Sequence, residues 1–386
     1  MPPSGAEAWA RACSTRHGLC LHAAPGTVGT TVLAALASAE RAWEVVTGVL
    51  GAPAPDADED GAWHAYLVDP SAGIDGSDAV LGVPDPVARF DRASSFALVD
   101  RRVAPGCALD LAMARAVARA SLWRSAPATD EGSARAESQA LALLAVPCAA
   151  GGDELDEFQA WPERTLVDPA TPSYDRGAAL FFGWIDATFG AEPGAILTGL
   201  WALSPTRTPP RASRWAGSPT GFDVLTVSLA GALGTDSNLD DVLARFAVDR
   251  ALATPSGRTA WHVPWPARAR RFASPVAVSP TGASYVLVDV AGAPPGAKLR
   301  VEAAWEDFGR MRWSIVKLDA RGHTIAVVPV TSLRLATTAA MTVELLEGVD
   351  RVLVVGVNVG STEHPFDPDQ GEWEPHGWLL TLSDGS

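Results

Sequence analysis

The feature that most constrains the fold is a change of residue pattern near residues 261–271. Before this segment, apolar side chains recur at helical spacing over several long stretches. After it, short β-rich runs alternate with turns and the helical spacing is lost. The chain has 386 residues, more than one hydrophobic core usually serves. We therefore predict an α+β protein, with a mainly helical domain and a small sheet over residues 1–270 and an antiparallel β-sandwich over residues 271–386.

In the first domain, apolar periodicity and flanking Gly and Pro residues define the elements. Strands are expected at residues 63–68 and 95–99, and the chain between them is expected to form loops or short edge strands. Helices are expected at residues 28–50, 109–123, 131–146, 173–189, 195–203, 222–233 and 239–248. In the second domain, strands are expected at residues 285–290, 298–305, 312–318, 324–330, 340–346, 351–359 and 378–382.

The four cysteines fall into two local pairs. Cys13 and Cys20 can close a small loop, and Cys107 and Cys148 flank the expected pair of antiparallel helices. We predict both disulfides, which indicate export to the periplasm, the cell surface or the extracellular medium. The alternative is four buried thiols in a cytoplasmic protein. The first residues lack a basic segment followed by an apolar one, so we expect the signal peptide to have been removed or to lie upstream.

Composition excludes several function classes. The net charge of −15 argues against a nucleic-acid partner, because duplex affinity comes mainly from basic residues on phosphates. No apolar run reaches the roughly 20 residues that span a bilayer. Lys298 and Lys317 are the only lysines, as expected from the codon bias of a GC-rich bacterial genome. No phosphate-binding loop, dinucleotide fingerprint or serine-hydrolase elbow occurs, so no organic cofactor is expected, and a protein or glycan ligand stays open.

Residues 28–250 carry an order of elements that resembles the gluzincin metallopeptidases. A long helix precedes a strand Trp-His-Ala-Tyr-Leu-Val-Asp, a second strand Ser-Phe-Ala-Leu-Val-Asp, a helix pair and a helix that begins with Tyr. The Tyr-Asp-Arg-Gly segment at Tyr174 resembles the start of that family's third helix. The Glu-Ser-Gln-Ala segment at Glu137 resembles the segment that carries the third zinc ligand. The resemblance implies a cleft to which Glu137 and Tyr174 would contribute.

The chain departs from that family at the metal site. The family's helix after the second strand carries His-Glu-x-x-His, which places two zinc ligands and a general base on one face. Here the helix reads Leu-Ala-Met-Ala-Arg-Ala-Val-Ala-Arg-Ala from Leu111, and Arg115 and Arg119 would repel a divalent cation. We expect a degenerate member without zinc or peptidase activity, in which Glu137 lies on the helix surface and pairs with Arg135 or a neighbour.

An acidic turn in the first domain is a candidate calcium site. Asp56, Asp58 and Asp60 match the opening of a calcium loop, D-x-D-x-D-G, in which alternating carboxylates converge on one cation. Leu67 stands where the closing bidentate Glu is required, so the motif is half complete. The alternative is a solvated turn before a strand.

A second acidic loop lies in the expected sandwich. Residues 363–374 include Asp367 and Asp369 among five carboxylates, with aromatic residues nearby. Such a loop could bind a cation or a sugar, or could be a solvated connection. His364 and His376 flank this loop and are the histidine pair to be tested as metal ligands.

We therefore interpret the chain as an exported, non-enzymatic binding or structural protein built on a degenerate metallopeptidase scaffold. One alternative is a hydrolase of unrecognised type that uses cleft carboxylates such as Asp100, Asp110 or Glu137, and paired carboxylates with raised pKa values would support it. The other is a carbohydrate-binding protein, which requires an exposed aromatic platform on the sandwich formed by Trp305, Trp313, Trp373 or Trp378.

Overall fold

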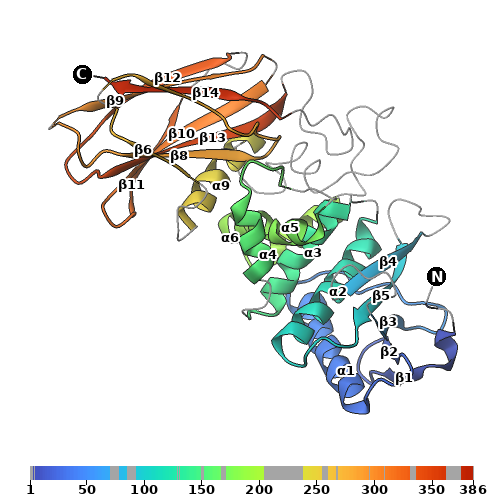
Figure 1. Cartoon of the computed structure of the whole chain (residues 1–386). Helices are drawn as coiled ribbons and strands as arrows, with labels where there is room; N and C mark the ends of the chain where they lie inside the picture. Colours follow the sequence, from blue (N-terminus) through green and yellow to red (C-terminus); the bar gives the residue numbers. More distant parts are fainter. Residues whose placement is uncertain are drawn as a thin grey trace. The chain divides into compact units, whose positions relative to one another are not determined.

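A computed structural model shows the described part of the chain as two compact units (Figure 1). The first comprises Met1–Asp156 and Val167–Asp236, and the second comprises Glu157–Leu166 and Ser237–Ser386. Residues 157–166 and 237–270, which the expected border assigns to the first domain, thus group with the second unit. The structure describes residues 3, 5–69, 78–84, 93–127, 129, 131–148, 152–166, 171–203, 238–253, 260–266, 268–294, 296–307, 309–330, 336–361 and 375–385.

One sheet in the first unit has the strand order β1-β2-β3-β5-β4. Its central strands β2, β3 and β5 run parallel, and the edge strands β1 and β4 are antiparallel to their neighbours. The bounds are β1 Ala10–Cys13, β2 Leu19–Ala23, β3 Trp63–Val68, β4 Asp78–Pro84 and β5 Ala93–Asp100. Strands β3 and β5 are confirmed, and β4 is an edge strand within the region expected to hold loops or edge strands. The sequence pattern did not predict β1 and β2, which are too short for a clear alternation.

The helices of the first unit are α1 Gly29–Trp43, α2 Cys107–Ser125, α3 Glu131–Ala145, α5 Pro172–Gly177, α6 Ala179–Phe189 and α7 Ala195–Leu203. Helix α4 Gly152–Ala160 begins in the first unit and ends among residues grouped with the second. The helix expected at residues 28–50 is α1 continued by a π-helical segment, η2 Glu44–Val49, and a short 3-10 helix η1 spans Ala6–Ala8. The helix expected at residues 173–189 is divided into α5 and α6, and α4 was not expected. The helix expected at residues 222–233 lies outside the described residues.

Helix α2 is buried on every side along its middle turns. Every second residue from Ala112 to Ala120 is alanine, whose small size lets several neighbouring elements approach closely. The main neighbours are α1, α3, β5 and β4. The helix in which the metallopeptidase resemblance places the zinc ligands is therefore a central element of the first unit.

The second unit contains two sheets and helix α9 Leu239–Ala253. One sheet has the order β11-β10-β13-β8-β6, and the other has the order β12-β9-β14-β7. The bounds are β6 Trp261–Pro264, β7 Arg270–Ala273, β8 Ala283–Asp289, β9 Lys298–Trp305, β10 Gly309–Leu318, β11 Thr324–Val330, β12 Thr338–Glu344, β13 Arg351–Ser361 and β14 Trp378–Asp384. All seven expected strands are present. The sequence did not predict β6 and β7, and β6 pairs in parallel with β8, so the sandwich is not purely antiparallel.

The sandwich core forms between the inward faces of the two sheets. Along β9, buried and more exposed residues alternate, as expected for a strand with one face on a core. Val301, Ile315 and Val354 are buried in one apolar cluster that draws on both sheets. The rings of Trp313 on β10 and Trp378 on β14 meet edge to face across it, with centroids 5.8 Å apart.

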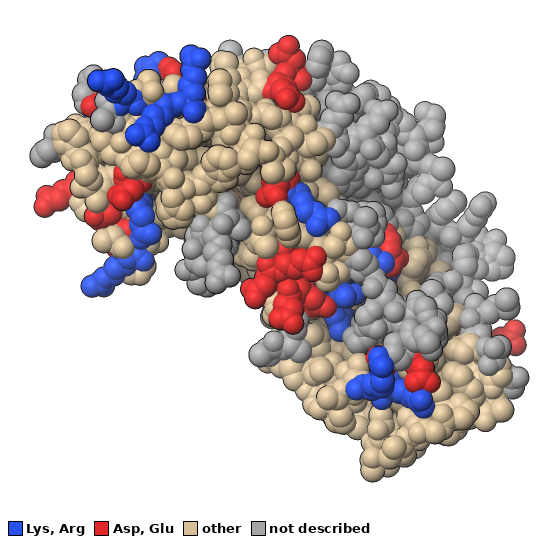
Figure 2. All heavy atoms as spheres, viewed as in Figure 1, with Lys and Arg blue, Asp and Glu red and all other residues tan. Residues whose placement is uncertain are grey.

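Charged side chains lie in small groups on the face of the molecule drawn in Figure 2. Several described arginines are paired on the surface, including Arg16 with Glu40 and Arg101 with Asp69. The described basic side chains lie in several separate groups on that face. Within the described ranges, no helix is long and apolar enough to cross a membrane.

Candidate functional site

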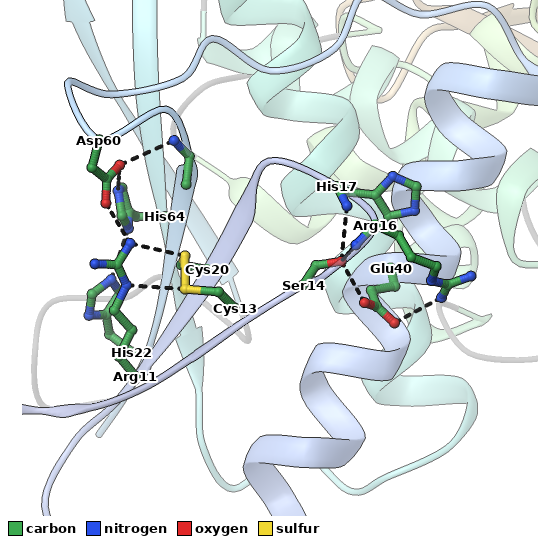
Figure 3. Close-up of a disulfide and its surroundings, with 11 residues drawn as sticks. Arg11, Cys13, Ser14, Arg16, His17, Cys20, His22, Glu40, Asp60 and His64 are labelled. Atoms are coloured by element: carbon green, nitrogen blue, oxygen red, sulfur yellow. Dashed lines mark hydrogen bonds and ion pairs between the residues drawn. A yellow bond between two sulfur atoms is a disulfide. The ribbon is translucent and has the colours of Figure 1, made fainter.

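Polar side chains from three neighbouring strands gather on one face of the first unit's sheet. Because strand residues alternate between faces, Arg11 and Cys13 of β1 share a face. Cys13 lies opposite Cys20 of β2, and Cys20 lies beside His64 of β3. His22 of β2 and Asp60, which precedes β3, complete the set (Figure 3). We call Arg11, Cys13, Cys20, His22, Asp60 and His64 the disulfide cluster.

The guanidinium of Arg11 spans the Cys13–Cys20 disulfide (Figure 3). Arg11 Nε donates to Cys13 Sγ over 3.2 Å, and an Arg11 Nη2 proton is directed at Cys20 Sγ over 3.1 Å. The same Nη2 nitrogen donates to Asp60 Oδ2 over 2.5 Å. One cation thus bridges both sulfur atoms and a carboxylate.

Two histidines and Asp60 form a hydrogen-bonded chain beside the disulfide. His64 Nε2 lies 3.0 Å from Asp60 Oδ1, and His64 Nδ1 lies 2.8 Å from His22 Nε2. An ionised carboxylate only accepts hydrogen bonds, so His64 Nε2 carries the proton toward Asp60. His64 Nδ1 then accepts the hydrogen bond donated by His22 Nε2. The chain fixes one tautomer for each ring.

The surroundings keep His22 neutral and Asp60 ionised. Burial, the charge of His64 and the charge of Arg11 lower the pKa of His22 from 6.5 to about 4. Burial alone would raise the pKa of Asp60, but hydrogen bonds from His64, from the Ala62 backbone and from Arg11 lower it from 3.8 to about 2. At neutral pH the cluster therefore holds an ionised Asp60 against the Arg11 cation.

Aromatic rings cover the inner side of the cluster. His22 stacks on Tyr66 with ring centroids 4.6 Å apart, and Tyr66 contacts Trp9 and Phe96 edge to face at 6.2 Å and 5.9 Å. Cys20 and His22 are buried, whereas Cys13 is exposed. The two sulfur atoms of one disulfide therefore belong to residues of very different exposure.

Sequence reasoning found the disulfides but not the rest of this cluster. Cys13–Cys20 and Cys107–Cys148 are both present, as predicted. Alternation along β3 places His64 and Tyr66 on one face of the sheet. The sequence signal that could have found the cluster is Arg-x-Cys at Arg11 followed by Cys-x-His at Cys20. In the hairpin of β1 and β2, Arg11 lies opposite His22 and Cys13 lies opposite Cys20.

The helix on which the resemblance would place two zinc ligands carries ion pairs to neighbouring helices. Arg115 and Arg119 of α2 are buried. Arg115 Nη1 donates to Glu154 Oε1 over 3.1 Å, and Arg119 Nη2 donates to Glu131 Oε2 over 2.5 Å. Arg176 Nε also donates to Glu154 Oε1, over 2.7 Å. The two arginines that were expected to repel a cation are thus tied to carboxylates of α3 and α4.

Glu137 does not lie on the helix surface, so that expectation is wrong. Its exposure is 1%, and its Oε2 accepts a hydrogen bond from Trp201 Nε1 over 2.6 Å. The reason is that α3 is covered on this side by α6 and its neighbours, which the sequence pattern of one helix does not reveal. Tyr174, the other cleft candidate, is fully buried in α5.

The acidic turn of residues 56–61 does not converge on a cation. Asp56 pairs with Arg124 at 3.5 Å, and Asp60 is occupied by Arg11 and His64. Within the described residues, no three His, Cys, Asp or Glu side chains are grouped as metal ligands. Asp367 and Asp369 lie outside the described residues, as does His364. His376 is buried with its Nδ1 at 3.5 Å from Glu306 Oε2.

The carboxylates named for the hydrolase alternative are hydrogen-bonded to neighbouring side chains. Burial alone would raise the pKa of Asp100, but hydrogen bonds from the Arg102 side chain and backbone and the charges of Arg102 and Arg101 lower it. Asp110 accepts hydrogen bonds from Ser38 and Arg41. A paired carboxylate with a raised pKa is therefore not found at Asp100, where the hydrolase alternative required one.

The aromatic platform of the carbohydrate alternative is mostly internal. Trp305, Trp313 and Trp378 are buried in the sandwich core, and Trp373 lies outside the described residues. Their large apolar rings fill the space between the sheets, which a count of tryptophans in the sequence cannot distinguish from a surface platform.

Comparisons with known proteins leave the family open. Neither a family model nor a characterised protein matches the chain. Among solved structures, it is similar to the pre-peptidase C-terminal domain of collagenase from Bacillus anthracis, with 8% identity and a TM-score of 0.21 over 32% of this chain and 94% of that one. It is also similar to the enzymatically active domain of tailspike protein 4 from bacteriophage CBA120, with 15% identity and a TM-score of 0.19 over 30% of this chain and 15% of that one. These scores carry no argument about function and do not indicate a gluzincin fold.

Proposed function

We propose that the chain is an exported protein that acts by binding or as a structural component, on a metallopeptidase-like scaffold that has lost its zinc site. The observation that carries the proposal is the pairing of buried Arg115 and Arg119 with Glu154 and Glu131. These pairs occupy the helix on which the resemblance would place two zinc ligands and the general base.

The chemistry of these side chains supports a structural role. A guanidinium has no lone pair for a metal and stays protonated at all physiological pH values. Once buried, it needs hydrogen-bond acceptors, and removing a carboxylate partner is costly. Glu137 also accepts a hydrogen bond from the indole N–H of Trp201, so this carboxylate takes part in packing between helices. Helix α2 thus acts as a packed support in this proposal.

The element order of the first unit supports the scaffold part of the proposal. Helix α1 joins the parallel strands β2 and β3, β4 is an antiparallel edge strand, and α2 follows β5 directly. Of these elements, the resemblance to the gluzincins is based on the order of α1, β3, β5 and α2, while β2 and β4 were not part of it. The two disulfides support export, because such bonds persist in oxidising compartments.

The test uses the full chain, produced through a secretion pathway without a metal-affinity tag. Elemental analysis is expected to find no stoichiometric zinc, and an unfolded protein substrate is expected to stay intact with or without a chelator. Alkylation before and after reduction is expected to show no free thiol in native material and four after reduction. One equivalent of zinc, lost on chelation together with a peptidase activity, would overturn the proposal. Four free thiols in native material would overturn export.

The binding part is tested separately with immobilised full-length protein. Purified cell-envelope polysaccharides and unfolded peptides serve as the probes, and saturable binding of one class with a defined stoichiometry is expected. Turnover of either probe would favour the hydrolase alternative. Saturable binding of a polysaccharide that persists when the exposed tryptophans are replaced would support a glycan ligand.

A further inference from the structure

We propose that the Cys13–Cys20 disulfide is a site of reversible thiol–disulfide exchange with an external dithiol, in which Arg11 stabilises the Cys20 thiolate that leaves. The proposal rests on the disulfide cluster alone and does not depend on the proposed function. It assigns a chemical role to the cation that spans the two sulfur atoms.

The contact between Arg11 and the sulfur atoms strengthens when the disulfide opens. A disulfide sulfur is a weak, neutral acceptor, whereas a thiolate carries a full negative charge. Arg11 Nε and Nη2 are already within 3.2 Å and 3.1 Å of the two sulfurs, so no side-chain movement is needed to meet that charge. Neighbouring arginines lower the pKa of cysteine thiols, and a thiolate of lower pKa is the better leaving group. Arg11 therefore favours the reduced state over the oxidised one.

Exposure decides which sulfur is attacked. Cys13 is exposed on the edge strand β1, whereas Cys20 is only 3% exposed on β2. An incoming thiolate can thus reach the Cys13 sulfur, and Cys20 becomes the leaving group. Edge strands are open on one side, which leaves room for a partner that carries the attacking thiol.

The exchange balances with a dithiol as the reductant. A thiolate of the dithiol attacks Cys13 Sγ, the S–S bond breaks, and its electron pair becomes the Cys20 thiolate beside Arg11. The second thiol of the partner, once deprotonated, attacks the partner's own sulfur in the mixed disulfide and releases Cys13 as a thiolate. The partner leaves as a disulfide, having given two electrons to the chain. Of its two protons, one is taken up by Cys13 and the other passes to solvent.

Asp60 and His64 hold Arg11 in position for this role. Asp60 Oδ2 accepts from Arg11 Nη2, and Asp60 Oδ1 is fixed by His64. His22 supports His64 in turn, and Tyr66 supports His22. The guanidinium is thus held over the sulfur atoms by a chain that extends into the interior. Asp60 is a positioning residue, because it touches Arg11 and neither sulfur in these contacts.

The test compares Arg11→Gln with Arg16→Gln in the full chain. Arg16 is an exposed arginine in the same hairpin connection that pairs with Glu40 and Glu44, so it controls for general loss of positive charge. Each protein is equilibrated with mixtures of reduced and oxidised dithiothreitol. The fraction of each disulfide that has opened is then measured by alkylation and peptide mass spectrometry.

We expect Arg11→Gln to lower the equilibrium constant for reduction of Cys13–Cys20 by about fivefold or more. Arg16→Gln should match the unmodified chain, and the Cys107–Cys148 bond should be unaffected by either substitution. An unchanged constant in Arg11→Gln would overturn the proposal. A bond that becomes easier to reduce would also overturn it, because Arg11 would then act as a shield.

A second measurement does not require the exchange reaction. In Cys13→Ser the remaining Cys20 thiol is titrated by its thiolate absorbance, alone and combined with Arg11→Gln. We expect the pKa of Cys20 to lie below the ordinary value of about 8.5 and to rise when Arg11 is replaced. A Cys20 pKa that is the same in both proteins would overturn the role of Arg11 even if the exchange constants differ.

Discussion

The interior of the first unit and the core between the two sheets of the second unit bury different kinds of side chain. The interior of the first unit includes charged residues, among them Arg115, Arg119 and Asp175, whereas the core between the two sheets of the second unit is apolar. Asn358, a polar residue buried in the second unit, is neutral and its side chain is satisfied: it donates to the Val278 carbonyl and accepts from the Gly360 backbone. The interior of the first unit therefore contains specific charged pairs, whereas the core between the two sheets depends on shape and volume.

This difference predicts different sensitivity to substitution. A buried charge that loses its partner stays in a medium of low polarity, which costs more than an average change of packing. An apolar core tolerates changes of similar volume and responds mainly to cavities and clashes. The predictions below test whether the two interiors respond in these separate ways.

The largest effect is expected from Asp175→Asn. The Asp175 side chain is fully buried and its Oδ2 lies 3.2 Å from Arg135 Nη1, while Arg135 is 17% exposed. Removing the negative charge leaves Arg135 with Glu131 as its other carboxylate partner. We expect a loss of about 3 kcal/mol in the free energy of unfolding, measured by chemical denaturation.

Hydrogen exchange locates this effect. The amides of α3 and α5 should lose protection in Asp175→Asn, whereas those of β8 to β14 should keep theirs. Asp153→Asn, an exposed change on α4, is the matched control and should alter neither set. Equal loss of protection in the sandwich strands would mean that the two interiors do not respond separately.

A clash in the sandwich should have a smaller effect. Gly356 of β13 faces the ring of Trp313, and a Cβ at this position would lie 2.6 Å from Trp313 Cζ3. We expect Gly356→Ala to lower the free energy of unfolding by about 2 kcal/mol, because the buried ring must shift. Gly292→Ala, where an added Cβ meets nothing within 4 Å, is the control. If both substitutions are equally mild, the core is looser than its contacts indicate.

The sandwich was largely predictable because its strands carry a local signal. Residues with one face on the core alternate, and turns rich in Gly, Pro and Asp separate the runs, so strands such as β9 and β11 match the expected ranges at both ends. The strands β6 and β7 each have only four residues, too few for a pattern. Pairing of β6 with β8 in parallel depends on the tertiary fold.

The candidate site was less predictable because it is assembled across strands. The disulfide pairings follow from spacing, but the contacts of Arg11 with Cys20 and Asp60 depend on the register of β1 with β2 and on the turn before β3. The burial of Glu137 depends likewise on which helices cover α3. Sequence patterns report the face of one element, and they do not report which distant elements cover it.

A pH-dependent effect is expected from the disulfide cluster. His22 titrates near pH 4 in the folded chain and at 6.5 in its ordinary state, so between these values only the unfolded chain binds the proton. Stability should therefore fall as the pH falls from 7 to 4.5. The groups that face His22 are His64, Arg11, Asp60 and Tyr66. The folded pKa of Asp60 is about 2 and its ordinary value is 3.8, so Asp60 adds to the pH dependence of stability only below about pH 4.

His22→Phe tests this effect by keeping a ring on Tyr66 while removing the titrating group. We expect the loss of stability between pH 7 and pH 4.5 to shrink by about 1 kcal/mol, a value reduced to allow for partial solvent screening of the cluster. His323→Phe is the control, because the His323 side chain is 73% exposed in the sandwich unit. Identical pH profiles for His22→Phe and the unmodified chain would show that His22 does not carry the dependence.

The smallest effect is expected from an ion pair on the outside of the sandwich, which isolates the environment as the variable. Lys298 and Glu344 are opposite residues on β9 and β12, their charged atoms are 3.0 Å apart, and their side chains are 44% and 65% exposed. Water and salt screen such a pair, and holding two long side chains in one geometry costs conformational freedom. A double-mutant cycle with Lys298→Met and Glu344→Gln should give a coupling energy below about 0.5 kcal/mol that falls further in high salt.

The same cycle on Arg135 and Asp175 should give several times that value with little dependence on salt, because burial removes the screening. If the two cycles agree, burial is not what makes the charged interior of the first unit sensitive, and the contrast between the two units must come from their packing.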